Sequence, residues 1–331
     1  MKVVVLGYGL IGKERIRALV DLRAAGCPLD TIGVFDPHVS SAATAAPDVV
    51  CLQSFEAVAD LKPDWVIVAA PHDAAVELIS LILPWGCRVL MEKPFGRSVS
   101  EARLLASHIR FPEQLWIGFN YRFFPGVAQA IADARSGRFG TLVSASIVLG
   151  HGGSPGMEKG WKFDPLRAGG GCLIDPGIHL LDLCRLLSPG GVAPLQAWIW
   201  RGFWNTGIEE EAHLLLQADG FLINLQVSIV RWRSTFRFEL HGTAGYGLVQ
   251  GRGRSYGPQT YTRGRRWGWQ AGLTQAESEE RVLTSECDAS FSDELRALLR
   301  PEAARGPLSP CRWDEALEAM RLYEGCLKVL R

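Results

Sequence analysis

The sequence lacks an excess of charge of either sign. Its 331 residues contain 35 Lys+Arg and 35 Asp+Glu, so the formal net charge is +0. No nucleic-acid partner is expected, because proteins that bind nucleic acids neutralise phosphates with surplus Lys and Arg. Whole-chain disorder is excluded as well, since it requires low hydrophobicity and high net charge, and 47% of these residues are hydrophobic.

Long apolar runs and clustered metal ligands are also missing. No run reaches the ~18–20 residues of a membrane helix, so no membrane partner is expected. The apolar N-terminus is broken by glycines and followed directly by charged residues from Lys13 to Arg17, which favours folded structure over a secretory signal. The cysteines form no CxxC pair and the histidines no HExxH. We therefore expect buried thiols in a cytoplasmic protein and no metal site.

What is present in residues 1–120 is an alternation of short apolar runs with helical stretches. Helices are expected up to Ala25, at Asp73–Leu83 and at Ser98–Ile109. The expected strands are Lys2–Leu6, Thr31–Phe35, Val49–Leu52, Trp65–Ala70, Cys87–Met91 and Leu115–Gly118. Strands that alternate with helices imply βαβ units, and the sequence therefore predicts an α/β domain with a parallel sheet.

Residues 121–331 show a different pattern, with alternating apolar and polar positions that predict an antiparallel or mixed sheet in an α+β domain. A helix is expected at Pro176–Leu187, a loop at Gly251–Gln270, and a last helix at 313–329 that is expected to return to the first domain. The expected strands are Thr141–Leu149, Leu195–Phe203, His213–Gln217, Phe221–Trp232 and Thr235–His241.

A G-x-G-x-x-G motif at Gly7, Gly9 and Gly12 directly follows the first strand and opens a helix. In that setting the glycines allow a tight turn, a close approach to a pyrophosphate and close helix packing, and the N–H groups at the helix start face the phosphates. Asp36 ends the second strand and is expected to accept hydrogen bonds from the adenosine ribose. Because its carboxylate would repel a 2′-phosphate, NAD is expected rather than NADP. The alternative is a structural glycine turn.

Three further motifs are Met91-Glu92-Lys93-Pro94, Gly118-Phe119-Asn120-Tyr121-Arg122 and the run GGGCLIDPGIHLLD that ends at Asp182. With the glycine motif, they resemble the Gfo/Idh/MocA family along nearly the whole chain. The resemblance implies a Rossmann domain joined to an α+β domain with a large open, mostly antiparallel sheet. It also implies NAD(P)-dependent alcohol–ketone chemistry on sugars or polyols, with Lys93, Asp175 and His179 at the positions of the catalytic residues.

The chemistry of these three side chains agrees with that role. A carbinol that loses a hydride must also lose its hydroxyl proton, and a histidine is an efficient acceptor. His179 lies four residues after Asp175, which places both on one side of a first helical turn, where the helix dipole favours neutral imidazole. Lys93 is expected to stabilise developing alkoxide charge. The structural alternatives are a helix cap at Asp175, a buried core histidine and an ordinary loop lysine.

Further site residues follow from the same motifs. Cofactor contacts are expected from Gly7, Gly9, Leu10, Ile11, Gly12, Asp36, Ala70, Pro71, His72, Glu92, Lys93, Asn120, Arg122 and Trp161, and substrate contacts from Lys93, Tyr121, Lys162, Asp175 and His179. Carboxylate pairing is the alternative for Arg122, and core packing is the alternative for Trp161. His151 either lines the substrate cleft or belongs to a flexible loop.

Two features bear on the partners. Arg252, Arg254, Arg263, Arg265 and Arg266 lie in a stretch without acids, which either meets a nucleotide-sugar diphosphate or forms a solvated loop or subunit contact. Trp198 and Trp200 share one strand face, which is either core or a sheet-to-sheet interface; the family resemblance favours the interface, and with it a homodimer or homotetramer.

The expected function is hydride transfer between nicotinamide and a secondary alcohol or ketone of a sugar, polyol or nucleotide sugar. Two alternatives stay open on the sequence. One is a redox-neutral, NAD-dependent glycosidase or lyase, and the other is a non-catalytic regulator that senses dinucleotide.

Overall fold

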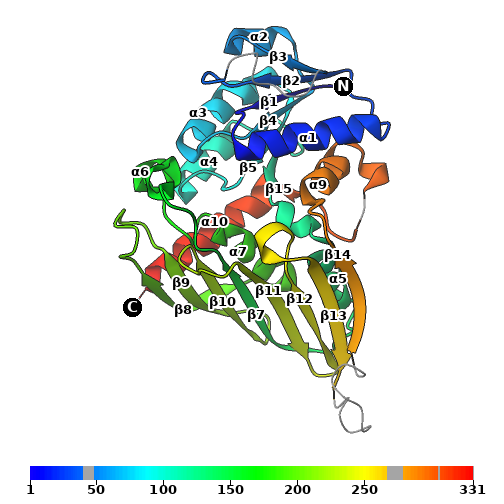
Figure 1. Ribbon diagram of the computed structural model, residues 1–331, viewed down its shortest axis with the longest axis vertical. Helices are drawn as coiled ribbons and strands as arrows, with labels where there is room; N and C mark the ends of the chain where they lie inside the picture. The colour runs from blue at the N-terminus through cyan, green and yellow to red at the C-terminus, as the bar shows by residue number, and fades with distance from the viewer. Residues whose placement is uncertain (40–47, 267–278, 305, 331) are drawn as a thin grey trace. The chain divides into compact units, whose positions relative to one another are not determined.

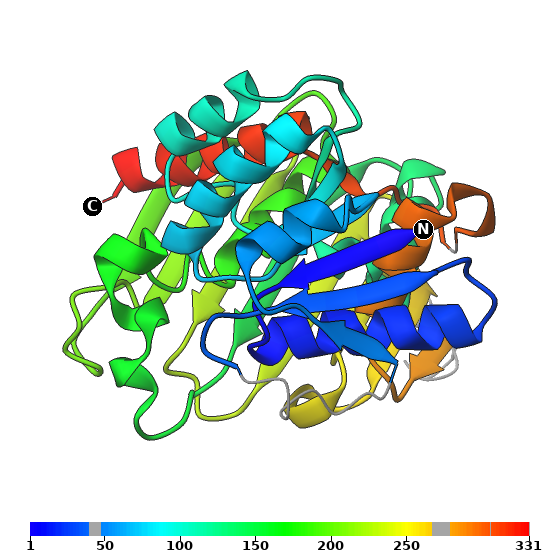
Figure 2. The ribbon, with the colours of Figure 1, turned by 90° about the horizontal axis from the view of Figure 1, so that it is seen from above.

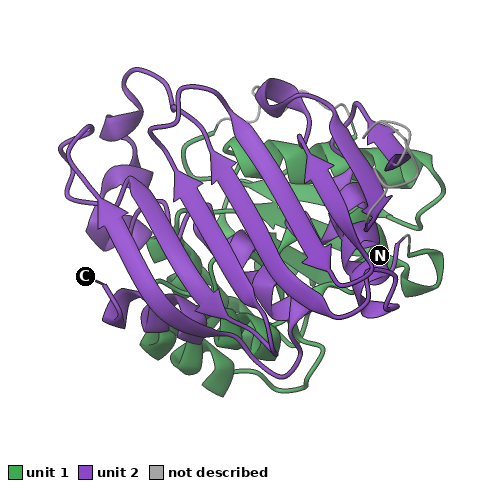
Figure 3. Cartoon of the chain, turned by 90° about the horizontal axis from the view of Figure 1, so that it is seen from below, with its two compact units in different colours: residues 1–120, 291–305, 309–320 green, residues 121–290, 306–308, 321–331 purple. Residues whose placement is uncertain are grey.

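The chain forms two compact units in the computed structural model, which describes residues 1–39, 48–266, 279–304 and 306–330 (Figure 3). Unit 1 comprises Met1–Asn120, Phe291–Arg305 and Ser309–Met320, and unit 2 comprises Tyr121–Ser290, Gly306–Leu308 and Arg321–Arg331. The last helix, α10 (Trp313–Lys328), is divided between the two. Among the described residues, no helix has the length and apolarity required to cross a bilayer.

Unit 1 is built on a seven-stranded sheet with the order β15-β6-β5-β4-β1-β2-β3 (Figure 1). All neighbouring pairs are parallel except the edge pair of β15 and β6. The continuous apolar run of β4 is buried on both faces, as expected of a central parallel strand. The strands are β1 (Lys2–Leu6), β2 (Thr31–Phe35), β3 (Val49–Cys51), β4 (Trp65–Val68), β5 (Arg88–Glu92), β6 (Leu115–Gly118) and β15 (Cys311–Arg312).

Helices cover both faces of this sheet, as Figure 2 shows. On one face, Leu19 of α1 and Leu295 of α9 share a hydrophobic core with Val3 and Val5 of β1. On the other face, α3 contacts β4, β5 and α4. The helices of unit 1 are α1 (Leu10–Ala24), α2 (Phe55–Asp60), α3 (His72–Ile82), α4 (Val99–Ser107) and α9 (Ser290–Leu299).

Unit 2 is built on an eight-stranded sheet with the order β14-β13-β12-β11-β7-β10-β9-β8. Only the central pair of β7 and β10 is parallel, and the other pairs are antiparallel. Helices α5 (Pro125–Arg135) and α7 (Gly177–Leu187) pack on one face, while the strands of the opposite face lie in full view in Figure 3.

The strands of this sheet are β7 (Leu142–Gly150), β8 (Ala193–Trp200), β9 (Glu211–Gln217), β10 (Leu222–Ser228), β11 (Thr235–Gly242), β12 (Gly245–Gln250), β13 (Gln259–Arg265) and β14 (Glu279–Ser285). The loops that follow β7 and β12 contain short helical turns, namely η4 (Met157–Lys159), η5 (Trp161–Phe163), α6 (Pro165–Ala168) and η6 (Arg254–Tyr256). Another turn, η3 (Asn120–Phe123), lies between β6 and α5.

The predicted fold class is confirmed, and most predicted elements lie within a few residues of the observed ones. The loop prediction for Gly251–Gln270 is wrong over β13, and residues 267–270 lie outside the described part. Arginine-rich β13 is a strand because it pairs on both sides, with β12 and β14, and because Arg263 forms ion pairs with Asp133 and Glu280. The prediction of buried thiols is wrong for Cys287, which is exposed.

Candidate functional site

The predicted cofactor residues of unit 1 gather at the carboxyl edge of the parallel sheet. Gly7 follows β1, Asp36 follows β2, Pro71 follows β4 shortly after its end, and Glu92 ends β5. Because these strands are parallel, their carboxyl ends share one edge of the sheet. In open α/β sheets, ligands bind at this edge.

The turn between β1 and α1 requires glycine at two positions. Gly7 has a φ of +95°, and a Cβ there would lie 2.5 Å from the Ala69 carbonyl oxygen. A Cβ on Gly12 would lie 2.0 Å from the Gly7 carbonyl oxygen. A Cβ on Gly9, the N-cap of α1, would instead enter open space, and no side chain caps the helix there. The first-turn N–H groups, including those of Leu10 and Ile11, thus fit a dinucleotide pyrophosphate.

Asp36, at the end of β2, is hydrogen-bonded to this glycine turn. Its Oδ2 accepts a hydrogen bond from the Tyr8 backbone N–H at 2.7 Å, and its Oδ1 accepts one from the His38 N–H at 2.9 Å. Each carboxylate oxygen has a second lone pair, so contact with ribose hydroxyls remains compatible with these bonds. Sequence reasoning missed this loop-fixing role.

Glu92 is held by a buried arginine. Arg15 Nε donates to Glu92 Oε1 at 2.6 Å, and the Arg15 guanidinium also pairs with Glu294 of α9 at 2.6 Å. Arg15 and Glu294 are fully buried. Burial acts to lower the pKa of Arg15, but the two carboxylates outweigh it and hold that pKa above its usual value. The Glu92 carboxylate is thus part of a structural ion-pair network, and its contact with the cofactor stays a prediction.

The other predicted residues of unit 1 lie near the same edge. Ala70 and Pro71 connect β4 to α3, whose first residue, His72, is 5% exposed. Lys93 directly follows β5 and is half-buried. Asn120, also buried, is the last residue of the first segment of unit 1.

In unit 2, His179 is the third residue of α7 and lies flat against Tyr121. The two rings are 4.0 Å apart between centroids, with an interplanar angle of 5°, and each side chain is only 4% exposed. Burial raises the pKa of Tyr121 above its usual range, so its hydroxyl stays protonated. The Tyr121 ring thus supports the histidine, and its contact with substrate stays a prediction.

Asp175 pairs with Lys162, as 2.8 Å separates Lys162 Nζ from Asp175 Oδ2. The Asp175 side chain is 10% exposed and that of Lys162 is 46% exposed. The predicted helix-cap alternative for Asp175 is wrong, because α7 begins at Gly177 and Pro176 holds the N-cap position without a side-chain bond. The expected stacking of Asp175 and His179 on one helical turn is wrong for the same reason.

Arg122 forms a buried bidentate pair with Asp182. Its Nε donates to Asp182 Oδ2 at 2.7 Å and its NH2 group to Oδ1 at 2.6 Å, with the two side chains 2% and 1% exposed. The carboxylate alternative is therefore observed, and the cofactor contact of Arg122 stays a prediction. Asp182 lies one turn after His179 on α7, so this pair fixes the helix that carries the histidine.

Arginines of the arginine-rich stretch contact different partners. Arg252 lies over the rings of Tyr256, at 4.0 Å, and Tyr121, at 5.3 Å. Arg263 instead pairs with Asp133 and Glu280. Arg252 and Arg263 therefore have different partners, and a contact of this stretch with a diphosphate stays a prediction. Nothing in the sequence signalled that Arg252 would lie against Tyr121.

His151 lies close enough to the Asp175–Lys162 pair for their charges to influence it. Burial, assisted by the positive charges of Arg252 and Lys162, lowers its pKa, while Asp175 opposes them. Its Nδ1 accepts a hydrogen bond from the Gly153 N–H at 3.1 Å, so the proton of the neutral ring is on Nε2. Nearby, the Lys162 ammonium lies 5.7 Å from the ring centroid of Trp161, which is half-buried.

The segment Gly253–Gly257 spells G-x-S-x-G, the letters of a hydrolase nucleophile elbow, and sequence reasoning missed it. The structure places it between two antiparallel strands instead of between a strand and a helix. The hydroxyl of Ser255 is hydrogen-bonded to that of Ser234 at 3.0 Å. Moreover, Nδ1 of nearby His151 accepts a bond, whereas a triad histidine donates from that atom to an acid. This arrangement does not fit a serine hydrolase.

Comparison with known proteins places both units in one family. Residues 1–115 match the family described as an oxidoreductase family with an NAD-binding Rossmann fold, and residues 127–246 match the GFO/IDH/MocA C-terminal domain.

Two curated proteins are similar to parts of this chain. The rhizopine catabolism protein MocA of Rhizobium meliloti is 30% identical over 189 residues, which cover 55% of this chain and 56% of that protein. D-glucoside 3-dehydrogenase of Escherichia coli is 33% identical over 124 residues, which cover 37% of this chain and 35% of that protein. This chain thus matches about half of the first relative and about a third of the second.

Solved structures share the fold across the full length. A levoglucosan dehydrogenase in complex with NADH and levoglucosan has a TM-score of 0.80 at 18% identity, covering 99% of this chain and 96% of that one. A UDP-N-acetylglucosamine 3-dehydrogenase from Acidithiobacillus ferrooxidans has a TM-score of 0.74 at 20% identity, covering 100% and 97%. With both units matched to their own family descriptions and the fold shared throughout, the chain belongs to the Gfo/Idh/MocA family, whose N-terminal unit is an NAD-binding Rossmann domain.

Proposed function

We propose that the protein is an NAD-dependent oxidoreductase that acts on a secondary hydroxyl of a sugar or a related polyol. The observation that carries the proposal is the cluster in unit 2, where His179 lies on the buried ring of Tyr121 and Asp175 pairs with Lys162. The charge of Asp175 also acts on the Tyr121 hydroxyl, so the two parts of the cluster are neighbours. Curated relatives include dehydrogenases of glucosides, levoglucosan and inositols.

Bound NAD would be held by the glycine turn and Asp36 and would supply the acceptor for the hydride of the carbinol carbon. An imidazole nitrogen of His179 takes the hydroxyl proton. One C–H bond and one O–H bond break, and the C–O single bond of the alcohol becomes the C=O double bond of the ketone. The position of His179 in the first turn of α7 favours the neutral ring that this step requires. Asp175 and Lys162 offer a hydrogen-bond acceptor and a donor to neighbouring hydroxyls. Stabilisation of alkoxide charge by Lys93 rests on the resemblance of its motif.

A cofactor-reduction screen tests this function. Purified protein is mixed with NAD and with free sugars, glycosides, inositols and nucleotide sugars, and absorbance at the NADH wavelength is followed together with the ketone product. We expect NADH and ketone in equal amounts for at least one sugar, and a higher kcat/KM with NAD than with NADP because of Asp36. Substrate consumption without accumulated NADH would contradict the proposal and indicate the redox-neutral alternative. Binding of NAD without turnover of any sugar would indicate the regulatory one.

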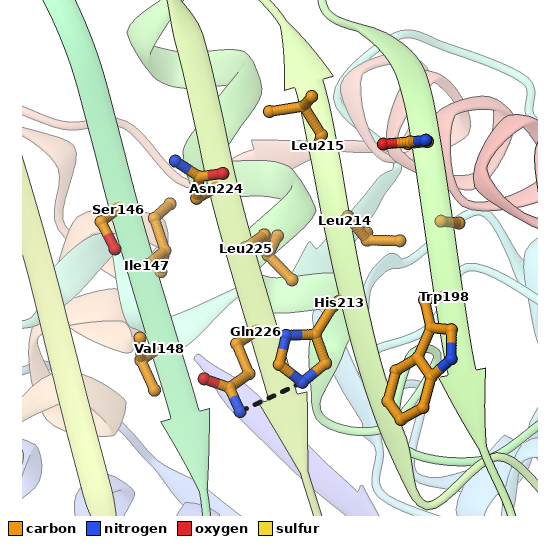
Figure 4. A pocket seen from close by; sticks show the side chains of 12 residues that line it. Ser146, Ile147, Val148, Trp198, His213, Leu214, Leu215, Asn224, Leu225 and Gln226 are labelled. Atoms are coloured by element: carbon orange, nitrogen blue, oxygen red, sulfur yellow. Dashed lines mark hydrogen bonds between the residues drawn. The ribbon is translucent and has the colours of Figure 1, made fainter.

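We also propose that the exposed face of the unit 2 sheet pairs with a second copy of this chain, as a homodimer or within a homotetramer. Trp198 is 48% exposed and Leu222 is 42% exposed, although both lie on sheet strands. Figure 4 shows Trp198, His213 and Gln226 on adjacent strands, side by side on this face. A shallow depression of about 550 Å³ lies among them. Exposed apolar side chains concentrated on a sheet favour an interface.

Replacement of Trp198 and Leu222 together by arginine is expected to convert the oligomer to monomer, because two charges would have to be buried without partners. Mass by light scattering after size-exclusion chromatography measures the change. Leu81→Arg, at a leucine of α3 that is 56% exposed, serves as the control and should keep the native mass. A monomeric wild-type protein would refute the proposal.

A further inference from the structure

Unit 2 contains a second concave site, a cavity of about 940 Å³ formed by four loops at one end of its sheet. The loops follow β7, β8, β10 and β12. The lining residues are His151, Gly152, Gly153, Ser154, Pro155, Gly156, Glu158, Phe203, Trp204, Trp232, Ser234, Ser255 and Tyr256. A space of this size suffices for a ligand of more than one ring.

Three aromatic side chains form one wall of this cavity. The ring of Phe203 lies 4.9 Å from that of Trp232 and 4.9 Å from that of Trp204, between centroids. Trp232 is nevertheless 68% exposed and Phe203 48% exposed. The Trp232 indole lies against the backbone of Gly152, where a Cβ would be 2.7 Å from its Cε3. An exposed aromatic surface held in place within a cavity is suited to bind the apolar face of a ring.

The rest of the lining offers hydrogen bonds to hydroxyl groups. The hydroxyls of Ser234 and Ser255 lie 3.0 Å apart. Oε2 of Glu158 is buried without a hydrogen-bond partner among the described residues. His151 carries its proton on Nε2 and can donate it. Aromatic rings together with hydroxyls and a carboxylate match a polyhydroxylated ring.

The charge of the lining distinguishes between the candidate substrates. Its residues include no lysine or arginine, and Glu158 carries its only formal charge. Arg252 lies over the face of the Tyr256 ring and is not part of the lining. A diphosphate would therefore meet a carboxylate with no cation in the lining, whereas recognition of phosphate uses Arg and Lys. The cavity thus favours a neutral ligand.

The cavity adjoins the candidate catalytic cluster at two points. His151 experiences the charges of Asp175 and Lys162. Tyr256 contacts Arg252, which lies over Tyr121, and Tyr121 supports His179. A ring in this cavity can therefore belong to the same ligand as a sugar ring that meets Asp175 and Lys162.

We propose that this cavity is a subsite for the second ring of a neutral glycoside, so that the enzyme oxidises a glycosidically linked sugar in preference to a free monosaccharide or a nucleotide sugar. The proposal rests on the function proposed above. The second ring, a sugar or an aryl aglycone, packs on Phe203 and Trp232. The first ring lies toward Asp175.

Trp232→Ala tests this subsite. The measured quantity is kcat/KM for glucose disaccharides and aryl glucosides divided by kcat/KM for glucose, with UDP-glucose in parallel. The wild-type ratio is expected to exceed one for at least one glycoside, and the variant is expected to lower it about tenfold, the effect of one lost stacking contact. Leu104→Ala is the control, since this leucine of α4 is 52% exposed in unit 1 and its loss should leave the ratio unchanged.

A binding assay separates failure of this proposal from failure of the proposed function. Disaccharides and aryl glucosides are titrated into the protein, and quenching of tryptophan fluorescence is compared with that in Trp232→Phe and Trp232→Ala. Binding that is retained by the Phe variant and weakened by the Ala variant supports the subsite even if no sugar reduces NAD. Equal affinities in all three proteins, or a wild-type preference for glucose or UDP-glucose, would overturn it.

Discussion

His179→Asn is expected to lower kcat by about 10²–10⁴-fold, the range for loss of a general acid–base group. Asparagine keeps a polar side chain of moderate size in the first turn of α7 but cannot take the substrate proton at neutral pH. The affinity for NAD should stay close to that of the wild type, because the glycine turn and Asp36 belong to unit 1. Steady-state kinetics and a cofactor titration measure the two effects. Wild-type turnover in the variant would exclude His179 as the proton acceptor.

Tyr121 supplies the matched controls for that experiment. Tyr121→Phe keeps the ring that lies 4.0 Å from His179 and should change kcat only a few-fold. Tyr121→Ala removes the ring and leaves the imidazole free to change orientation, so kcat should fall well below that of the Phe variant. If both variants lost activity equally, the hydroxyl rather than the stacked ring would be the important group. Comparison of the two therefore separates positioning of His179 from a direct contact with substrate.

The sequence predicts unit 1 better than unit 2 for a physical reason. Buried parallel strands are short continuous apolar runs, and a glycine turn must follow β1 where the backbone of Ala69 approaches. These signals are local. The network of Arg15, Glu92 and Glu294 is not local, because Glu294 comes from α9, far along the chain, and joins unit 1 only after folding. Reasoning from single motifs assigned Glu92 to the cofactor and missed its partner.

The motifs point to the residues of the candidate site in unit 2, but not to their arrangement. Asp175, His179 and Lys162 follow from motifs, whereas the stacking of Tyr121 on His179 depends on tertiary structure. The Arg252 side chain likewise reaches Tyr121 from a loop that the antiparallel sheet brings alongside. The loop cavity escaped prediction because its aromatic residues come from separate connections, each of which resembles an ordinary exposed loop in sequence.

Arg122→Met is expected to destabilise the fold by about 3–5 kcal/mol, the cost of leaving one charge of a buried ion pair without its partner. Asp182 is 1% exposed and would keep its carboxylate in the interior of unit 2. Urea unfolding followed by circular dichroism measures the loss. Because α7 carries both Asp182 and His179, activity should fall together with stability.

A double variant decides whether that loss arises from the buried charge or from packing. Arg122→Met combined with Asp182→Leu removes both charges and fills the space with apolar side chains. Replacement of a buried ion pair by apolar residues is often neutral. The double variant should therefore recover most of the stability lost by Arg122→Met alone. Arg300→Met is the surface control. Its pair with Glu302 leaves the side chains 37% and 67% exposed, and its loss should cost less than about 1 kcal/mol. If the double variant were as unstable as the single one, the stability of α7 would depend on the shape of the Arg122 side chain, and the charge of Asp182 would contribute little.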